Sequence, residues 1–422
     1  MLKWNSAESG RLLKILGFML AVCIAGTYLL GKIDADTGEN KSAAVSEKAP
    51  VRQPVITAVI KDNTGTLDSS DIELLEKYAL CYGETLCTLE IGDFSQLFSE
   101  KSSEYYQNIS AYNVLTGIRK MSHLDLTLES AYVEYTVEQV SVSGNDTTVY
   151  IKENNVQKFA HLDDESCSYN INHIFVLTEK NGERYVKKHL QEEDFFLLAL
   201  EGWDNAISID DRQRAEKAVS IIIADAQENK ETLKISTGNP PENIPVKNTA
   251  YNRDAAVEYA RQWCNQRNYT GKYLAYDEYG GNCQNFASQC IHAGGIAMDS
   301  KGYGETQWKF YSQTLNTKQT PSGRSYSWTG VDPFYTYAVY NRADGLICQA
   351  DMQLEYAEKG DVIQVGAYGD WRHSLVITDV IKNDDGSLQD IIVASNTADR
   401  WNYPLSAYIH TYPRLIHIIG QN

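Results

Sequence analysis

One short stretch of the sequence contains a residue that can act as a nucleophile. Gly280 and Gly281 permit a tight backbone turn, Asn282 is a good N-cap residue, and a run that can be helical starts at Cys283. The free N–H groups and the dipole at a helix start favour thiolate, and a histidine cation nearby can bring a cysteine pKa down to about 3.5–7.5. The stretch therefore predicts a reactive thiol. The alternative is a buried structural cysteine, because buried free cysteines are common.

A histidine at the start of a predicted strand can provide the base that a cysteine nucleophile needs. His373 begins such a strand, which runs to Val380. Three other histidines compete for this role. His292 follows Cys283 closely and would project from the same helix, whereas His410 and His417 stay open as alternatives.

The base in turn usually needs a polar group that fixes its tautomer. Asp379 lies on the same predicted strand, but at about 3.3 Å per residue it is too far along to bond the ring of His373. Asn396, at the end of the next predicted strand, is the better candidate, and Asp399 is the alternative. An asparagine in this role resembles the Cys-His-Asn arrangement of papain-like proteases.

Composition excludes some classes of function. The chain has 422 residues, 56 of them acidic and 38 basic, and its formal net charge of -18 argues against nucleic acid as a partner. No metal-ligand spacing links four scattered histidines, so we predict neither a metal site nor another cofactor. These histidines are His123, His161, His173 and His189.

The eight cysteines do not form a regular disulfide framework. Cys81 with Cys87, or Cys264 with Cys348, can pair outside the cell, and the sequence does not choose between the possibilities. Cys290 lies two helical turns beyond the candidate nucleophile on the same side of the helix, so we predict that it is packed in the core.

The N-terminal segment predicts export. Lys3, Arg11 and Lys14 precede the apolar run 15–30, whose length lies between that of a signal core and that of a spanning helix. We therefore expect residues 1–33 to be a signal peptide or an N-terminal membrane anchor, and the protein to act outside the cytoplasm. Residues 34–54 have almost no bulky apolar side chains and read as a disordered spacer.

Two further regions follow. Residues 55–235 show helical patterns and then strands, with a hairpin signal at Asn181-Gly182, which predicts an α+β domain with an antiparallel sheet. The order of its elements resembles the nuclear-transport-factor-like fold. Residues 236–249 are rich in proline and predict a linker before a second α+β domain at 250–422.

The second region resembles the putative amidase domain of exported bacterial proteins, a family related to the papain-like NlpC-type and CHAP cell-wall hydrolases. The resemblance covers about 250–422 and rests on an ordered set of motifs, at 281–289, 294–296, 327–328, 360–364 and 373–378. It departs from the family at Asn282, where Asp is usual, and at Asn396, where His is frequent. The fold that this resemblance implies is papain-like, with the cysteine helix packed on an antiparallel sheet.

What the resemblance implies for function is an acyl-enzyme mechanism. Cys283 would be the nucleophile, His373 the base and Asn396 the third residue, acting on a peptide or amide substrate such as cell-wall peptidoglycan without a metal. A transpeptidase would use the same acyl-enzyme, and a non-catalytic surface-binding module is the alternative from another class. Three tryptophans either line the cleft or belong to the core, namely Trp308, Trp328 and Trp371.

Overall fold

A computed structural model describes residues 53–208, 210–235 and 238–422, and its residues Pro54–Asn422 form one compact unit. The predicted export segment and most of the predicted spacer fall outside the described residues. Within the described ranges, no helix is both long and apolar enough to cross a membrane.

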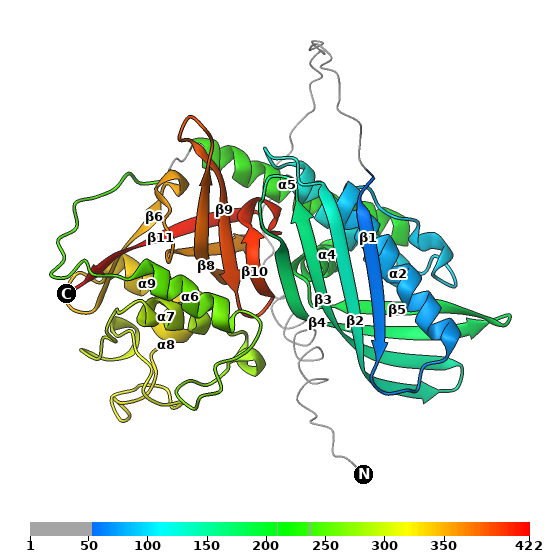
Figure 1. The fold of residues 1–422 in the computed structure, drawn as a ribbon, viewed down its shortest axis with the longest axis horizontal. Helices are drawn as coiled ribbons and strands as arrows, with labels where there is room; N and C mark the ends of the chain where they lie inside the picture. The colour runs from blue at the N-terminus through cyan, green and yellow to red at the C-terminus, as the bar shows by residue number, and fades with distance from the viewer. Residues whose placement is uncertain (1–52, 209, 236–237) are drawn as a thin grey trace. The chain divides into compact units, whose positions relative to one another are not determined.

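The first region combines long helices with a strongly paired sheet (Figure 1). The turn at Asn181-Gly182, with φ of 56° and 80°, joins two paired strands, so the predicted hairpin is confirmed. Asp68 caps the first long helix by accepting from the backbone N–H groups of Ser70 and Asp71. The elements are β1 (Val55–Asp62), α2 (Ser69–Thr88), η1 (Phe94–Gln96), α3 (Ser103–Lys120), β2 (Leu128–Ser143), β3 (Asp146–Phe159), β4 (Ser166–Lys180), β5 (Glu183–Gln191), α4 (Asp194–Asn205) and α5 (Asp211–Ile235).

The second region places short helices before a run of strands. Asn252 caps its first helix through a hydrogen bond of 3.0 Å from the Ala255 N–H to Asn252 Oδ1, as predicted. The elements are α6 (Arg253–Trp263), η2 (Asp277–Tyr279), α7 (Cys283–Ala293), η3 (Gly304–Thr306), α8 (Tyr326–Thr329), α9 (Val331–Tyr340), β6 (Leu346–Met352), η4 (Leu354–Tyr356), β7 (Val362–Ala367), β8 (Asp370–Lys382), β9 (Leu388–Ser395), β10 (Asp399–Pro404), η5 (Leu405–Ala407) and β11 (Tyr412–Gln421).

One sheet runs through both regions. Its strand order is β1-β2-β3-β4-β10-β9-β8-β7-β11-β6, with β5 beside β4, and its pairs are antiparallel except for β1 with β2. The junction is the antiparallel pairing of β10 with β4, in which Arg400 lies opposite Ser168. The predicted α+β class is confirmed. The domain boundaries at 235 and 250 and the nuclear-transport-factor-like reading stay predictions.

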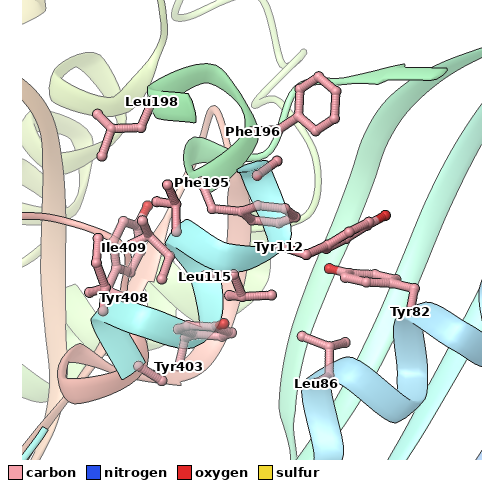
Figure 2. Close-up of a cluster of buried hydrophobic side chains, with 14 of the residues drawn as sticks. Tyr82, Leu86, Tyr112, Leu115, Phe195, Phe196, Leu198, Tyr403, Tyr408 and Ile409 are labelled. Atoms are coloured by element: carbon pink, nitrogen blue, oxygen red, sulfur yellow. The ribbon is translucent and has the colours of Figure 1, made fainter. Parts of the chain in front are cut away.

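The two faces of the second region's strands pack against different helices. Val376 of β8 and Ala394 of β9 belong to the cluster that contains α6, α7, α8 and α9. Leu375 and Ile377, which alternate with Val376 along β8, belong to the larger cluster that contains α2, α3, α4 and α5. Figure 2 shows the centre of that larger cluster, where Phe195 of α4 and Tyr112 of α3 gather with Tyr408 and Ile409. The first region therefore covers one face of the second.

A chain of buried polar side chains also joins the two regions. It begins at Glu153, whose Oε2 lies 3.0 Å from His173 Nε2, and continues from His173 Nδ1 to His189 Nε2 over 2.9 Å. In the other direction Asn155 donates to Glu153 and accepts from Gln157, and Arg119 donates to Gln157 over 3.1 Å and to the Tyr403 hydroxyl of β10 over 2.6 Å. Buried polar groups that are paired in this way give a core a defined arrangement.

A buried ion pair fixes the start of α4 on β10. Arg400 Nη2 lies 2.5 Å from Glu193 Oε2, and the side chains are 5% and 6% exposed. Arg400 also donates to Ser168 Oγ over 2.6 Å. Because each charge has lost its water, either one without the other is strongly unfavourable.

We expect Glu193→Gln to lower the free energy of unfolding by about 3–5 kcal/mol, because it removes the carboxylate that is paired with the buried Arg400 guanidinium. The measurement is urea unfolding followed by circular dichroism. Glu216→Gln is the matched control, because Glu216 pairs with Arg212 at the surface over 3.1 Å and such a pair contributes about 0.3–0.5 kcal/mol. A loss of equal size in the two variants would contradict the prediction.

Candidate active site

Cys283 is the first residue of α7 and Asn282 is its N-cap residue, as the sequence predicts, but the side-chain cap bond is absent. Asn282 occupies the N-cap position with φ of −110° and ψ of −1°, and its side chain makes no cap hydrogen bond. Side-chain capping needs an extended backbone at this position. The helical ψ of Asn282 turns its amide away from the helix start and frees it for other contacts.

The Asn282 side chain links the helix start to two loops instead. Its Oδ1 accepts from the Tyr276 N–H over 3.0 Å, and its Nδ2 donates to Asn396 Oδ1 over 3.0 Å. Its own backbone N–H donates to Thr397 Oγ1 over 2.7 Å. Thr397 and Ala398 have φ of 59° and 56°, values that side chains other than glycine adopt at a cost of about 1–3 kcal/mol. The hydrogen bonds to Asn282 help to hold this strained turn beside Cys283.

The Cys283 thiol is enclosed. The residue is 6% exposed, and the backbone N–H groups of Ser374 and Gln284 donate to the sulfur. Burial nevertheless raises the pKa of Cys283 to about 11, and the carboxyl group of Asp194 acts in the same direction. The helix start therefore does not give a preformed thiolate in this structure, because loss of water outweighs the nearby N–H groups.

His373 lies on the neighbouring backbone of β8 and is equally enclosed. Its ring lies 5.9 Å from that of Tyr408 between centroids, and its Nε2 is buried without a hydrogen-bond partner. Burial, and after it the charge of Arg400, lowers the pKa of His373 to about 3. The next residue, Ser374, projects to the opposite face and donates to Gln284 Oε1 of α7 over 2.7 Å.

The structure thus brings Cys283 to the backbone of β8 beside His373. The sulfur contacts the Ser374 N–H. Ser374 precedes Val376, the residue at which the pairing of β8 with β9 begins, so this N–H is not used in that pairing. In the described part of the chain, no hydrogen bond joins the thiol to the His373 ring. Their catalytic roles stay predictions.

Asn396 and Asp399 are both engaged away from His373. Asn396 Nδ2 donates to the carbonyl groups of Trp263 and Cys264 over 2.9 and 2.8 Å, while its Oδ1 holds Asn282. Asp399 Oδ1 lies 2.9 Å from Arg267 Nη1. Neither side chain has a hydrogen bond to the His373 ring in the described ranges, so the third role also stays a prediction.

The competing histidines have other partners. His292 Nδ1 lies 2.8 Å from the Ile296 carbonyl, His410 Nδ1 lies 3.1 Å from the Tyr408 carbonyl, and His417 Nδ1 lies 2.7 Å from Asp361 Oδ2. Among the residues that the structure describes, no group of three or more His, Cys, Asp or Glu side chains is arranged to hold a metal ion.

The seven cysteines in the described ranges are free thiols, so neither of the two possible disulfides is present in this structure. Cys290 is fully buried, as predicted. Trp308 and Trp328 belong to the core with ring centroids 4.7 Å apart. Trp371 lines a cavity of about 690 Å³ together with Tyr412 and Arg414. Trp371 stands two residues before His373 on β8, so the strand that carries His373 also forms part of the cavity wall.

The sequence did not single out three residues next to the candidate pair. The charge of Arg400 lowers the pKa of His373, and the charge of Asp194 raises the pKa of Cys283. The ring of Tyr408 packs on that of His373. In the sequence, Asp194 belongs to an acidic run before a helix. Acidic residues are common at helix starts because they interact favourably with the helix dipole, so the run does not indicate a distant partner.

Comparison with known proteins identifies the family. A family model described as "Putative amidase domain" matches residues 250–419. Over 246 residues the chain is 30% identical to "Uncharacterized protein YhbB" of Bacillus subtilis (strain 168), a match that covers 57% of this chain and 70% of that protein. No solved structure matches the chain. The chain belongs to the putative amidase domain family, which supports hydrolysis of an amide as its chemistry.

We expect the rate of Cys283 alkylation by iodoacetamide to rise about tenfold per pH unit between pH 7 and 10, because the thiolate is the reacting form and its pKa is about 11. Peptide mapping of the purified full chain gives the rate at this thiol, and Cys283→Ser identifies the modified peptide. A plateau near pH 7 would instead indicate a thiolate that is already paired with a histidine cation.

Proposed function

We propose that this protein is an exported, cysteine-dependent amide hydrolase in which Cys283 is the nucleophile and His373 the base. The observation that carries the proposal is the position of Cys283 on the first turn of α7, with its sulfur against the Ser374 N–H. That contact puts the thiol one residue from His373 along β8. Membership of an amidase family supports the same chemistry.

The reaction would proceed through a thioester. The Cys283 sulfur attacks the amide carbonyl carbon while the thiol proton moves to His373, and the backbone N–H of Cys283 stabilises the oxyanion. The amine then leaves with the proton from His373. Water, deprotonated by His373, attacks the thioester, and the acid product and the free thiol are released.

Both groups are neutral at pH 7 in the described state, since the thiol pKa lies near 11 and the imidazole pKa near 3. The proton therefore moves during the attack and not before it. A substrate that displaces the surrounding side chains, or brings polar groups of its own, would ease this transfer.

The proposed substrate is a peptide amide outside the cytoplasm, with cell-wall peptidoglycan as the first material to test. The apolar run 15–30 after three basic residues supports export, either as a cleaved signal or as an anchor in the membrane. The cavity lined by Trp371 and Tyr412 offers an aromatic surface on the strand that carries His373, with both acidic and basic side chains around it.

One observation favours a second candidate, a non-catalytic binding module. Cys283 and His373 are 6% and 7% exposed, which a protein that no longer reacts with substrate would tolerate. A transpeptidase would share the acyl-enzyme and would differ in passing the acyl group to an amine. An added acceptor amine separates transfer from hydrolysis.

The test is release of amines from purified cell-wall fragments and from peptide amides by the full chain. We expect Cys283→Ala and His373→Ala to reduce turnover at least about a thousandfold, because they remove the nucleophile and its base. Cys81→Ala and His123→Ala are the matched controls and should retain activity, because Cys81 lies on α2 and His123 lies in the connection between α3 and β2, both in the first region. Activity that survives Cys283→Ala would overturn the proposal.

A further inference from the structure

A cation beside the turn that leads into α7 has no carboxylate partner. The backbone of Arg324 is held on both sides, because its N–H donates to the Thr314 carbonyl over 2.8 Å and its carbonyl accepts from the Asn316 N–H over 2.6 Å. Its Nη1 donates to Thr329 Oγ1 over 3.1 Å, and its Nε is buried without a hydrogen-bond partner. In the part of the chain that the structure describes, no acidic side chain forms an ion pair with this guanidinium. A guanidinium has five N–H donors, so most of them are left for another group.

Two aromatic rings hold the guanidinium in place. Its Cζ lies 4.9 Å from the Tyr276 ring centre and 5.8 Å from the Tyr326 ring centre. A guanidinium that stacks on a ring face keeps its edge, where the N–H groups point, available for planar hydrogen bonding. The ring of Tyr279 lies 6.2 Å from that of Tyr276, and Tyr279 and Tyr326 are 75% and 46% exposed. We call Tyr276, Tyr279, Arg324 and Tyr326 the arginine–tyrosine patch.

Four other arginines of the second region that pack on aromatic rings are neutralised. Each of them forms an ion pair with a carboxylate, namely Arg253 with Asp361, Arg372 with Glu201, Arg400 with Glu193 and Arg414 with Asp332. Arg261 packs on a ring without an ion pair in the described ranges, but it is exposed on α6, where water solvates its charge. Arg324 is half-buried, so its guanidinium needs an acceptor that the described part of the chain does not provide.

The Tyr276 hydroxyl is a second polar group of the patch without a partner. Tyr276 is 5% exposed, and its hydroxyl is buried without a hydrogen bond. Burial raises the pKa of Tyr276 to about 12, and the positive charge of Arg324 opposes that rise. The hydroxyl therefore keeps its proton at pH 7 and can donate it. A carboxylate has two oxygens that accept hydrogen bonds, and it matches a guanidinium edge and a neighbouring hydroxyl donor.

Backbone hydrogen bonds attach one half of the patch to the start of α7. The Tyr276 carbonyl accepts from the Gly281 N–H over 3.2 Å, and the Tyr276 N–H donates to Asn282 Oδ1 over 3.0 Å. Tyr276 is thus bonded to both residues that precede Cys283.

The other half of the patch is attached to the same helix. Tyr326 is the first residue of α8. Within α8, Trp328 Nε1 donates to Asn285 Oδ1 of α7 over 2.9 Å, and the Trp328 carbonyl accepts from Ser288 Oγ over 2.9 Å. Both halves of the patch are therefore fixed to the helix that begins at Cys283.

We propose that the arginine–tyrosine patch binds a carboxylate of the substrate, so that the protein acts on acidic peptides with a free carboxylate close to the amide that is cleaved. This inference rests on the proposed function. The guanidinium edge of Arg324 and the Tyr276 hydroxyl donate to the carboxylate oxygens, while the exposed rings of Tyr279 and Tyr326 contact the adjoining part of the peptide. Binding here holds the peptide against the turn before Cys283, and no bond or proton changes at the patch.

The experiment measures how tightly purified cell walls retain the full chain in a sedimentation assay. Two wall preparations are compared, both treated with hydrofluoric acid to remove phosphate polymers, and one with its carboxyl groups converted to methylamides. Every protein carries Cys283→Ala, so that the walls are not cleaved during the measurement. Arg324→Gln removes the charge, and Arg324→Lys keeps the charge without the planar fork. Arg261→Gln is the matched control, because Arg261 also packs on a ring, that of Trp401, and lies on another element.

The expected result is a loss that requires both the wall carboxylates and Arg324. On unmodified walls, Arg324→Gln should weaken binding at least about tenfold, because hydrogen bonds to a charged group contribute that much, and Arg324→Lys should weaken it less. Conversion of the carboxyl groups should weaken binding of the protein that retains Arg324 to the same extent. Arg324→Gln should then have no further effect, because the two changes remove one interaction. Arg261→Gln should change neither value.

Three outcomes would overturn the inference. These are equal retention on the two preparations, a loss in Arg324→Gln that is the same on both, and binding that appears only on walls whose phosphate polymers are still present. A residue with a structural role alone does not distinguish a carboxylate from a methylamide. Circular dichroism checks folding, and Arg324→Lys takes the place of Arg324→Gln in the same comparison if the latter does not fold.

Turnover separates this inference from the proposed function. If the wild type hydrolyses no amide but its retention depends on Arg324 and on wall carboxylates, the proposed function fails and the patch stands as a carboxylate-binding surface. If the wild type hydrolyses amides and its retention does not depend on carboxylates, the inference fails and the proposed function stands.

Discussion

The ion pair between Arg400 and Glu193 is the contact on which the arrangement around the candidate site depends. It joins the strand that continues the sheet from the first region to the helix start that carries Asp194. Because both charges are buried, the pair tolerates little displacement. The Tyr408 ring packs against the Arg400 guanidinium, and the His373 ring packs against Tyr408.

Burial is also what separates this site from an exposed cysteine–histidine pair. The same enclosure that keeps water from the thiol favours the neutral forms of both Cys283 and His373. The reactivity of the thiol therefore depends on how well the surrounding groups stabilise the charges that form when a proton moves from Cys283 to His373. A charged side chain from outside the amidase region has a larger effect in such a setting than it would in water.

Local patterns in the sequence predicted local structure well. The hairpin at Asn181-Gly182, the helix capped by Asn252 and the helix that starts at Cys283 follow from turn and cap chemistry that acts within a few residues. Asn282 takes the predicted N-cap position without a side-chain cap bond, and its side chain instead bonds Asn396, more than a hundred residues later in the chain. The place of Asp194 was missed for the same reason, since periodicity contains no information on which distant strand a helix start will meet.

The pairing of β10 with β4 has a consequence for how the protein can be divided. The amidase region alone would expose the free edge of β10, with the N–H and C=O groups that Asp399, Arg400 and Trp401 now place opposite β4. It would also expose the apolar side chains around Tyr408 and Ile409 that α4 covers (Figure 2). An open strand edge beside an apolar patch is a template for self-association. The first region thus covers a strand edge and an apolar surface that would favour self-association if the amidase region stood alone.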